Sequence, residues 1–222
     1  MEKATKQFRG ELLPFAFDVD PALGGAEWDV VAEWCAENTH QTDTFIDIGA
    51  NIGFIAACVG YFSKPKNIIA VEPDRAVLPY LQENLAIYAT NYAVLKSLVL
   101  DKVGRHEFFY NTDNPAQNSI YEREDLPNKR REVLDCTTVD EIVQIFKIRG
   151  PIVLKIDAEF AEPLIWKGIK HCLPQIKAMI MEYNPEYLSR LAGTDANAFG
   201  QELMKYFEVR DLNKNNIILL KK

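Results

Sequence analysis

Residues 45–54 have the residue types and spacing of a ligand-binding turn between a strand and a helix. The apolar run Phe45-Ile46-Asp47-Ile48 predicts a buried strand, and Gly49 and Gly53 follow where the chain must turn. A second apolar run leads to Glu72, a carboxylate at the tip of the next predicted strand. A glycine turn before a helix, with an acid at the next strand tip, is typical of pockets that bind a nucleoside through its ribose hydroxyls.

The spacing of the glycines separates the possible ligands. A dinucleotide loop has G-x-G-x-x-G, whose middle glycine makes room for a pyrophosphate, but Asn51 stands at that position. The chain also has no G-x-x-x-x-G-K-[ST] run, which a phosphate loop of that type needs. We therefore expect S-adenosylmethionine (SAM), which has a ribose and no phosphate, in a loop with Asp47 before it and exposed amides after it. A plain strand-to-helix turn that needs small residues is the structural alternative.

Carboxylates follow other predicted strands as well. The acids at or just past strand ends are Asp47, Glu72, Asp101, Asp157 and Glu182, and Glu159 lies two residues beyond Asp157. Ligands of open parallel sheets bind beyond the carboxyl ends of the strands. Any one of these acids could be a helix cap or a solvated loop residue. Together they predict an acidic rim that suits a cationic sulfonium cofactor and a polyhydroxy substrate.

The elements that must position these residues alternate between strands and helices. Strands are predicted at about 43–48, 67–72, 93–100, 105–110, 132–136, 151–157, 177–182, 207–212 and 216–221. Helices are predicted at about 26–38, 52–61, 78–88, 138–147, 162–172 and 195–206. Near-continuous apolar strands alternating with helices predict a parallel α/β sheet covered on both faces. The short turn before the last strand predicts an antiparallel pair at the end of the chain.

Length and composition favour one domain. The chain has 222 residues, of which 48% are hydrophobic and 26% charged, as in soluble globular proteins. Residues 1–40 are expected to form an N-terminal extension with one helix, of which 12–20 look extended. The polar segment 111–131 is long for a connection and is expected to be a lid or binding loop.

Charge and cysteine usage exclude several classes of protein. The net charge of −7 makes a nucleic-acid partner unexpected. No apolar run is long enough to span a bilayer and no signal-type segment begins the chain, so we expect a cytoplasmic protein without membrane insertion. The four cysteines are scattered without a C-x-x-C pair, and are expected to be core thiols rather than disulfides or zinc ligands.

Four stretches of the sequence resemble the FkbM-type methyltransferases, a branch of the SAM-dependent class I methyltransferases. They are residues 45–53, Val71-Glu72-Pro73, residues 134–140, and residues 154–162 with Lys167-Gly168. The resemblance implies a Rossmann-like sheet of seven mostly parallel strands with an antiparallel last strand, and helices on both faces. It also implies O-methyl transfer to a sugar or natural-product hydroxyl. Phe160 stands where the family usually has glycine, and if that glycine serves a positive φ, phenylalanine alters the pocket.

Methyl transfer is an in-line displacement at a carbon that is already activated. The protein must align the reactants and help to remove a proton from the hydroxyl. Glu182 and Glu159 are the candidate catalytic bases, and Asp157 either replaces them or orients the cofactor. A divalent metal on these three acids and Asn184 is possible, but it is not predicted.

The resemblance and the strand ends together give the expected contacts. Cofactor contacts are expected from Asp47, Gly49, Ala50, Asn51, Gly53, Phe54, Glu72, Ser97, Leu98, Asp101 and Asp157. Acceptor contacts are expected from Asn118, Ser119, Phe160 and Asn184. The oligomeric state is left open.

Three other functions stay open. Asn184-Pro185-Glu186-Tyr187 partly resembles the Asn-Pro-Pro-Tyr motif of methyltransferases that act on amino groups or nucleic acids, but it lacks the second proline and follows the fifth strand instead of the fourth. In a SAM-binding module with little or no activity, Phe160 would close the acceptor site. A nicotinamide-dependent dehydrogenase is disfavoured by Asn51.

Overall fold

A computed structural model describes residues 3–16, 25–124 and 129–222 of the chain. Their contacts fall into two units, Met1–Lys96 and Ser97–Lys222. Within the described residues, no helix is both long and apolar enough to cross a membrane.

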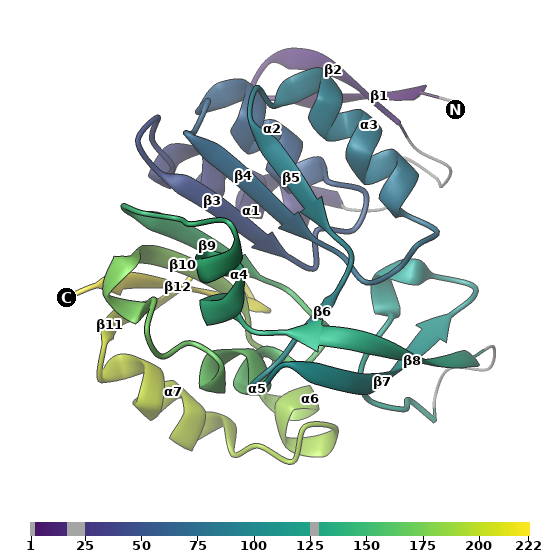
Figure 1. The fold of residues 1–222 in the computed structure, drawn as a ribbon, viewed down its shortest axis with the longest axis vertical. Helices are drawn as coiled ribbons and strands as arrows, with labels where there is room; N and C mark the ends of the chain where they lie inside the picture. Colours follow the sequence, from purple (N-terminus) through teal and green to yellow (C-terminus); the bar gives the residue numbers. More distant parts are fainter. Residues whose placement is uncertain (1–2, 17–24, 125–128) are drawn as a thin grey trace. The chain divides into compact units, whose positions relative to one another are not determined.

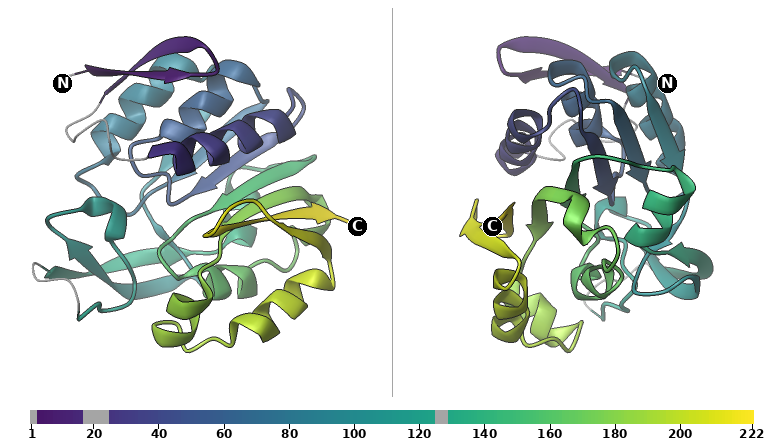
Figure 2. Two further views of the ribbon diagram at one scale, coloured as in Figure 1. Left: turned by 180° about the vertical axis from the view of Figure 1, so that it is seen from behind. Right: turned by 60° about the vertical axis from the view of Figure 1, so that its left-hand side comes forward.

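Three parallel strands form the sheet of the first unit: β3 (Thr44–Ile48), β4 (Asn67–Val71) and β5 (Tyr92–Leu95). Every residue of β3 is buried, because a parallel strand covered on both faces exposes neither side to water; Thr44 and Asp47 are its polar members. The helices are α1 (Gly25–Asn38), α2 (Phe54–Phe62) and α3 (Leu78–Tyr88), as the sequence predicted to within two residues. Helix α2 packs against both α1 and α3 (Figure 2).

The N-terminal extension contains more than the predicted helix. Strands β1 (Lys3–Phe8) and β2 (Glu11–Ala16) pair as an antiparallel hairpin, and β2 contacts α3. The predicted helix is present as α1, and the paired hairpin before it is a feature that the sequence analysis did not predict. The extended segment predicted for 12–20 is confirmed as far as Ala16, and its remaining residues lie outside the described part of the chain.

The second unit continues the strand–helix alternation. Strand β9 (Ile152–Ile156) lies parallel to β10 (Ile176–Glu182), and β12 (Asn216–Lys221) is antiparallel to both β10 and β11 (Phe207–Asp211). The helices are α4 (Val139–Ile145), α5 (Glu162–Lys167), α6 (Pro185–Arg190) and α7 (Ala196–Met204).

Helix α5 is shorter than the predicted helix 162–172. It ends before Gly168, where an added Cβ would lie 2.4 Å from the backbone oxygen of Leu100. The backbone at Leu100, far earlier in the chain, therefore packs directly on this helix end, and only glycine fits there. A short 3₁₀ turn, Leu173–Gln175, completes the connection to β10.

The predicted strand 93–100 is divided in the structure. Residues after β5 leave the main sheet, and β6 (Leu98–Val99) pairs with β8 (Lys129–Thr137), which is also antiparallel to β7 (Gly104–Asn111). These three strands form a separate small sheet. The predicted lid, 111–131, contains a 3₁₀ turn at Pro115–Gln117 and the first residues of β8; residues 125–128 of it lie outside the described residues.

The strand order is β3-β4-β5 within the first unit and β11-β12-β10-β9 within the second, with β12 antiparallel to β10 (Figure 1). This is the predicted α/β fold with seven mostly parallel strands. The four cysteines are buried free thiols, as expected from their scattered positions.

Candidate functional site

In the first unit, the loop after β3 has an unusual backbone. Gly49, Asn51 and Gly53 have φ values of 74°, 49° and 81°, in the left-handed region. Glycine enters this region without strain, and asparagine tolerates it better than most other residues. An added Cβ at Gly53 would lie 2.5 Å from Leu81 Cδ1, so this glycine also permits close packing of the loop on α3.

Glu72, just past β4, holds this loop in place. Its Oε2 accepts a hydrogen bond from the Asn51 amide at 2.8 Å, and its Oε1 accepts one from the Asp74 amide at 2.8 Å. A carboxylate has about four acceptor sites, and ribose hydroxyls are among the donors that such a group can bind. The position and chemistry of Glu72 therefore fit the role that the sequence suggested.

The expectation of exposed amides in the loop is wrong for most of its residues. The amides of Gly49 and Ala50 donate to the Val71 oxygen at 3.0 and 3.1 Å, and the Gly53 amide donates to the Ala50 oxygen at 2.8 Å. A phosphate group needs free N–H donors. Because these donors are already engaged, the loop suits a ligand without phosphate.

Two predicted cofactor residues of this unit are buried. Asp47 is fully buried in β3, and Phe54 is 2% exposed. The Phe54 ring packs against Phe8 and Phe15, at centroid distances of 6.0 and 5.2 Å, in an aromatic cluster of the N-terminal hairpin. Its side chain therefore serves packing, and a contact with a ligand would have to come from its backbone.

In the second unit, three carboxylates converge after β9 and β10. Oxygen atoms of Asp157, Glu159 and Glu182 all lie within 4.8 Å of one another. Two cations adjoin them: Lys155 Nζ lies 3.6 Å from Asp157 Oδ2, and Arg123 Nη1 lies 3.9 Å from Glu159 Oε2. The structure thus brings together the three predicted catalytic residues, which we call the carboxyl cluster.

Burial and mutual repulsion change how this cluster titrates. Burial, followed by the charges of neighbouring carboxylates, raises the pKa of Glu182 and of Glu159 well above the ordinary range. Burial also raises the pKa of Glu162, at the start of α5, to about 8. Like charges in a dry site cannot all ionise together. The raised pKa values of Glu159 and Glu182 make them stronger bases than an ordinary glutamate, which suits a general base.

The turn at Glu159 and Phe160 is where this chain departs from the family pattern, because phenylalanine stands in place of the usual glycine. Both residues have positive φ, 49° and 78°, so Phe160 adopts the backbone conformation that glycine favours. The Glu159 oxygen accepts a hydrogen bond from Ser119 Oγ at 2.7 Å. Phe160 is 4% exposed and stacks on Tyr187, with ring centroids 4.8 Å apart. The backbone keeps the conformation that glycine favours, and the phenylalanine ring is buried against α6.

Arg123 is a site residue that the sequence did not indicate. It is 6% exposed, and its guanidinium lies 5.9 Å from the Phe160 ring centroid and 5.5 Å from that of Tyr187. Burying an arginine is costly unless it is paired. Here Glu159 and the two aromatic faces compensate for the lost hydration.

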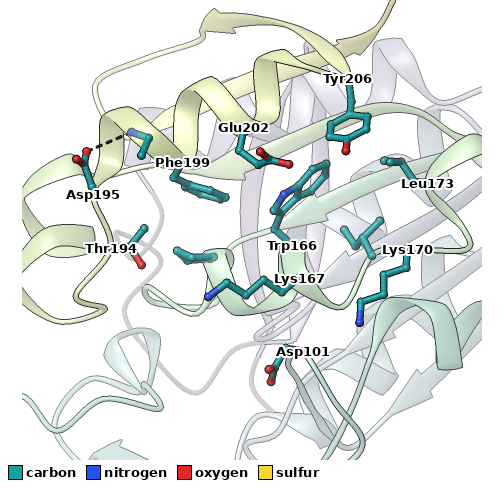
Figure 3. A pocket seen from close by; sticks show the side chains of 13 residues that line it. Asp101, Trp166, Lys167, Lys170, Leu173, Thr194, Asp195, Phe199, Glu202 and Tyr206 are labelled. Carbon is teal, nitrogen blue, oxygen red and sulfur yellow. Dashed lines mark hydrogen bonds between the residues drawn. The ribbon is translucent and has the colours of Figure 1, made fainter.

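The remaining predicted residues of this unit have structural partners. Asn118 Oδ1 accepts from the Asn111 amide at 2.8 Å, and Asn184 caps α6 by accepting from the Tyr187 amide. Ser97 Oγ donates to the Leu98 oxygen at 2.8 Å, and Leu98 is buried in β6. Asp101 lies at the edge of a separate pocket beside α5 and α7 (Figure 3). Their predicted ligand contacts stay predictions.

Among the described residues, the carboxyl cluster is the group whose ligand atoms could together hold a metal ion. Its oxygen atoms suit a hard cation such as Mg²⁺ or Ca²⁺. Lys155 and Arg123 already place two positive charges beside the three acids. Charge balance therefore does not require a metal, and none is assigned.

Comparisons with known proteins identify the family and the fold of this chain. Residues 47–214 match the methyltransferase FkbM domain. A putative caffeoyl-CoA O-methyltransferase from Staphylococcus aureus is similar in structure, with a TM-score of 0.51 and 11% identity over 94% of this chain and 86% of that one. No curated protein matches the sequence significantly. At such low identity the structural likeness concerns the fold, which is that of the class I methyltransferases.

Two further structures score lower. A putative rRNA methylase from Clostridium thermocellum has a TM-score of 0.49 and 9% identity, over 92% of this chain and 98% of that one. A putative methyltransferase from Streptococcus mutans in complex with SAH has a TM-score of 0.48 and 11% identity, over 88% and 97%.

Proposed function

The chain belongs to the methyltransferase FkbM domain family, whose methyl donor is SAM, and we propose that it methylates a hydroxyl group of a sugar or a hydroxylated natural product. The carboxyl cluster is the observation that carries this proposal. A hydroxyl is a weak nucleophile, and its reaction is helped by a carboxylate that takes up the proton.

Glu182 is the best candidate for that carboxylate. Its Oε2 is buried and has no hydrogen-bond partner among the residues that the structure describes. Lys155 pairs with Asp157, and Arg123 pairs with Glu159, whereas no ion pair to Glu182 occurs among the described residues. Burial and the neighbouring carboxylates outweigh the charge of Lys155 and raise the pKa of Glu182, so it is a stronger base than an ordinary glutamate.

The step balances in the following way. The acceptor oxygen attacks the methyl carbon of the sulfonium, the carbon–sulfur bond breaks, and its electron pair stays on sulfur to give S-adenosylhomocysteine (SAH). The hydroxyl proton passes to the Glu182 carboxylate. Lys155 then balances the remaining negative charge through Asp157.

An acceptor screen tests the proposal. The purified protein is incubated with SAM and with sugars, glycosides and hydroxylated aromatic compounds, and SAH formation is measured. We expect turnover with at least one hydroxyl acceptor and a methyl ether in its product. If only amines are methylated, the proposed O-methyl transfer is wrong and the reaction is N-methyl transfer.

The same assay with a folded RNA tests the nucleic-acid alternative. The net charge of −7 opposes binding to a phosphate backbone, so we expect no transfer to RNA.

Calorimetry with SAM distinguishes a SAM-binding module without activity from a protein that does not bind SAM. SAM binding without transfer to any acceptor would favour the module, and the buried Phe160 ring is the feature that such a result would point to.

A further inference from the structure

The second unit has a pocket that the proposed reaction does not use. It has a volume of about 710 Å³ and is bounded by α5, the segment that follows α5, and α7. Ligand pockets for small molecules commonly have volumes of roughly 300–1,000 Å³. None of the carboxyl cluster residues lines this pocket, so it would hold a different molecule, or a different part of one.

Aromatic and apolar side chains form most of the pocket surface. The Trp166 ring lies between those of Phe199 and Tyr206, and the centroids of Trp166 and Tyr206 are 5.7 Å apart (Figure 3). Ile169 and Leu173 also line it. Flat apolar surfaces of this kind favour a planar ring system, which can stack on or pack edge-on against the aromatic residues.

Several side chains that line the pocket are hydrogen-bond donors without a partner among the described residues. Trp166 lines the pocket, and its indole N–H has no hydrogen bond to any described residue. Lys167 and Lys170 form no ion pair with any described residue, and both lie on the side of the pocket that includes Asp101 (Figure 3).

Two of the acidic side chains around the pocket already bind other groups of the protein. Asp195 caps α7 by accepting from the Ala198 amide at 3.2 Å, and Glu202 pairs with Lys205. This leaves Asp101 against two lysines, so that side of the pocket carries a net positive charge. An apolar surface beside two ammonium groups and an indole N–H is complementary to a ring that bears an acidic group.

We propose that the pocket around Trp166, Lys167 and Lys170 is a second ligand site, which binds an aromatic carboxylate. The ring packs among Trp166, Phe199 and Tyr206. The carboxylate accepts hydrogen bonds from the two lysines and the indole N–H. This site is independent of the methyl-transfer chemistry, so it can be tested without a known acceptor.

The probe is 2-naphthoate, with 2-naphthalenemethanol as its neutral counterpart. Binding is followed by calorimetry and by the tryptophan indole N–H signals in ¹H–¹⁵N NMR spectra; the chain has three tryptophans, and W166F assigns the signal of interest. We expect 2-naphthoate to shift the Trp166 signal. K167Q/K170Q should weaken its binding at least about tenfold, because each lysine makes a charge-assisted hydrogen bond. Binding of the alcohol should be weak in both proteins.

A matched variant controls for overall charge. Lys66 and Lys96 are exposed, lie in the other unit and do not line the pocket, so K66Q/K96Q removes the same charge elsewhere. It should leave 2-naphthoate binding unchanged. The proposal is overturned if the Trp166 signal does not respond to 2-naphthoate, or if the two double variants weaken binding equally. Circular dichroism establishes that each variant is folded, and the lysine comparison stands even if W166F does not fold.

Discussion

Phe160 stacks on Tyr187 with the ring planes only 16° apart, while its own backbone has a φ of 78°. The side chain is well packed, but the backbone conformation is one that only glycine adopts without strain. These opposing effects predict an unusual order of stability for substitutions at this position.

F160G should be more stable than F160A. Both variants lose the buried ring, at a cost of about 3–5 kcal/mol. Alanine keeps the steric cost of positive φ, about 1 kcal/mol, which glycine removes. Urea unfolding measures the difference. In most positions glycine is the less stable of the two, so an F160A protein that equals or exceeds F160G would contradict the assigned backbone strain.

E182Q should abolish most of the methyl transfer. Removing a general base typically lowers the rate by about 10²–10⁴-fold. SAM affinity should be unchanged, since only the proton acceptor is lost. The exposed Glu186, on α6, provides the matched control, and E186Q should retain full activity. Equal losses in the two variants would remove Glu182 from the mechanism.

The pH profile gives a second measure of Glu182. Burial and neighbouring carboxylates raise its pKa well above the ordinary range. The base works only when ionised, so the rate should rise with pH in a range well above that in which an ordinary glutamate ionises. An ordinary glutamate would give a flat profile above about pH 5. A profile that is already flat from about pH 5 upward, with chemistry shown to limit the rate, would exclude Glu182 as the base.

Glu162 makes the stability of the fold depend on pH. Its pKa is raised to about 8 in the folded chain, against about 4.3 in an unfolded one. Between these values the folded state holds a proton that the unfolded state has released. The stabilisation linked to that proton is complete below the unfolded pKa and is lost as the pH rises to about 8.

The measurement compares the wild type with E162Q. The difference in unfolding free energy, wild type minus E162Q, should fall with increasing pH by up to about 1.4 kcal/mol per pH unit between these two pKa values. Glutamine cannot ionise, so it supplies a baseline without this linkage. A difference that stays constant or increases with pH would show that Glu162 is ionised in the folded protein.

The main sheet was predictable because its strands are largely apolar runs. Parallel strands covered on both faces bury nearly every side chain, and β3, β9 and most of β10 show this pattern, with Asp47 and Lys155 as polar exceptions. The break after β5 was not predictable. Ser97 lies within a run that looks continuous, and its hydroxyl bonds to the oxygens of Leu98 and Asp135, the second of which is distant in sequence.

The members of the carboxyl cluster could be predicted from the sequence, but the arginine that balances part of their charge could not. Acids at strand ends meet at one edge of a parallel sheet, so Asp157 and Glu182 could be paired from the sequence. Arg123 could not, because a lone arginine in a polar segment is usually exposed. Asn184 was considered for its place in a short motif, although asparagine before proline is also a helix-start signal, which α6 confirms.

Metal removal should leave methyl transfer unchanged. Lys155 and Arg123 provide two positive charges beside the carboxyl cluster, so a cation would compete with them for the same oxygens. SAH formation is measured in EDTA and again after addition of Mg²⁺ or Mn²⁺. Loss of activity in EDTA with recovery on addition of metal would instead place a divalent ion on Asp157, Glu159 and Glu182.

Glu72 should contribute to SAM affinity in two ways: it holds the loop in place, and it accepts hydrogen bonds from the ribose. Its two oxygens accept from the amides of Asn51 and Asp74. In E72Q, one of these amides would face an NH₂ group instead of an acceptor, and a ribose hydroxyl would lose a charged partner. Each such loss costs about 1–3 kcal/mol, so SAM affinity should fall at least about tenfold. Calorimetry measures it, with the exposed Glu11 as control: E11Q should bind like the wild type. Equal binding by E72Q would mean that the ribose is held by other residues.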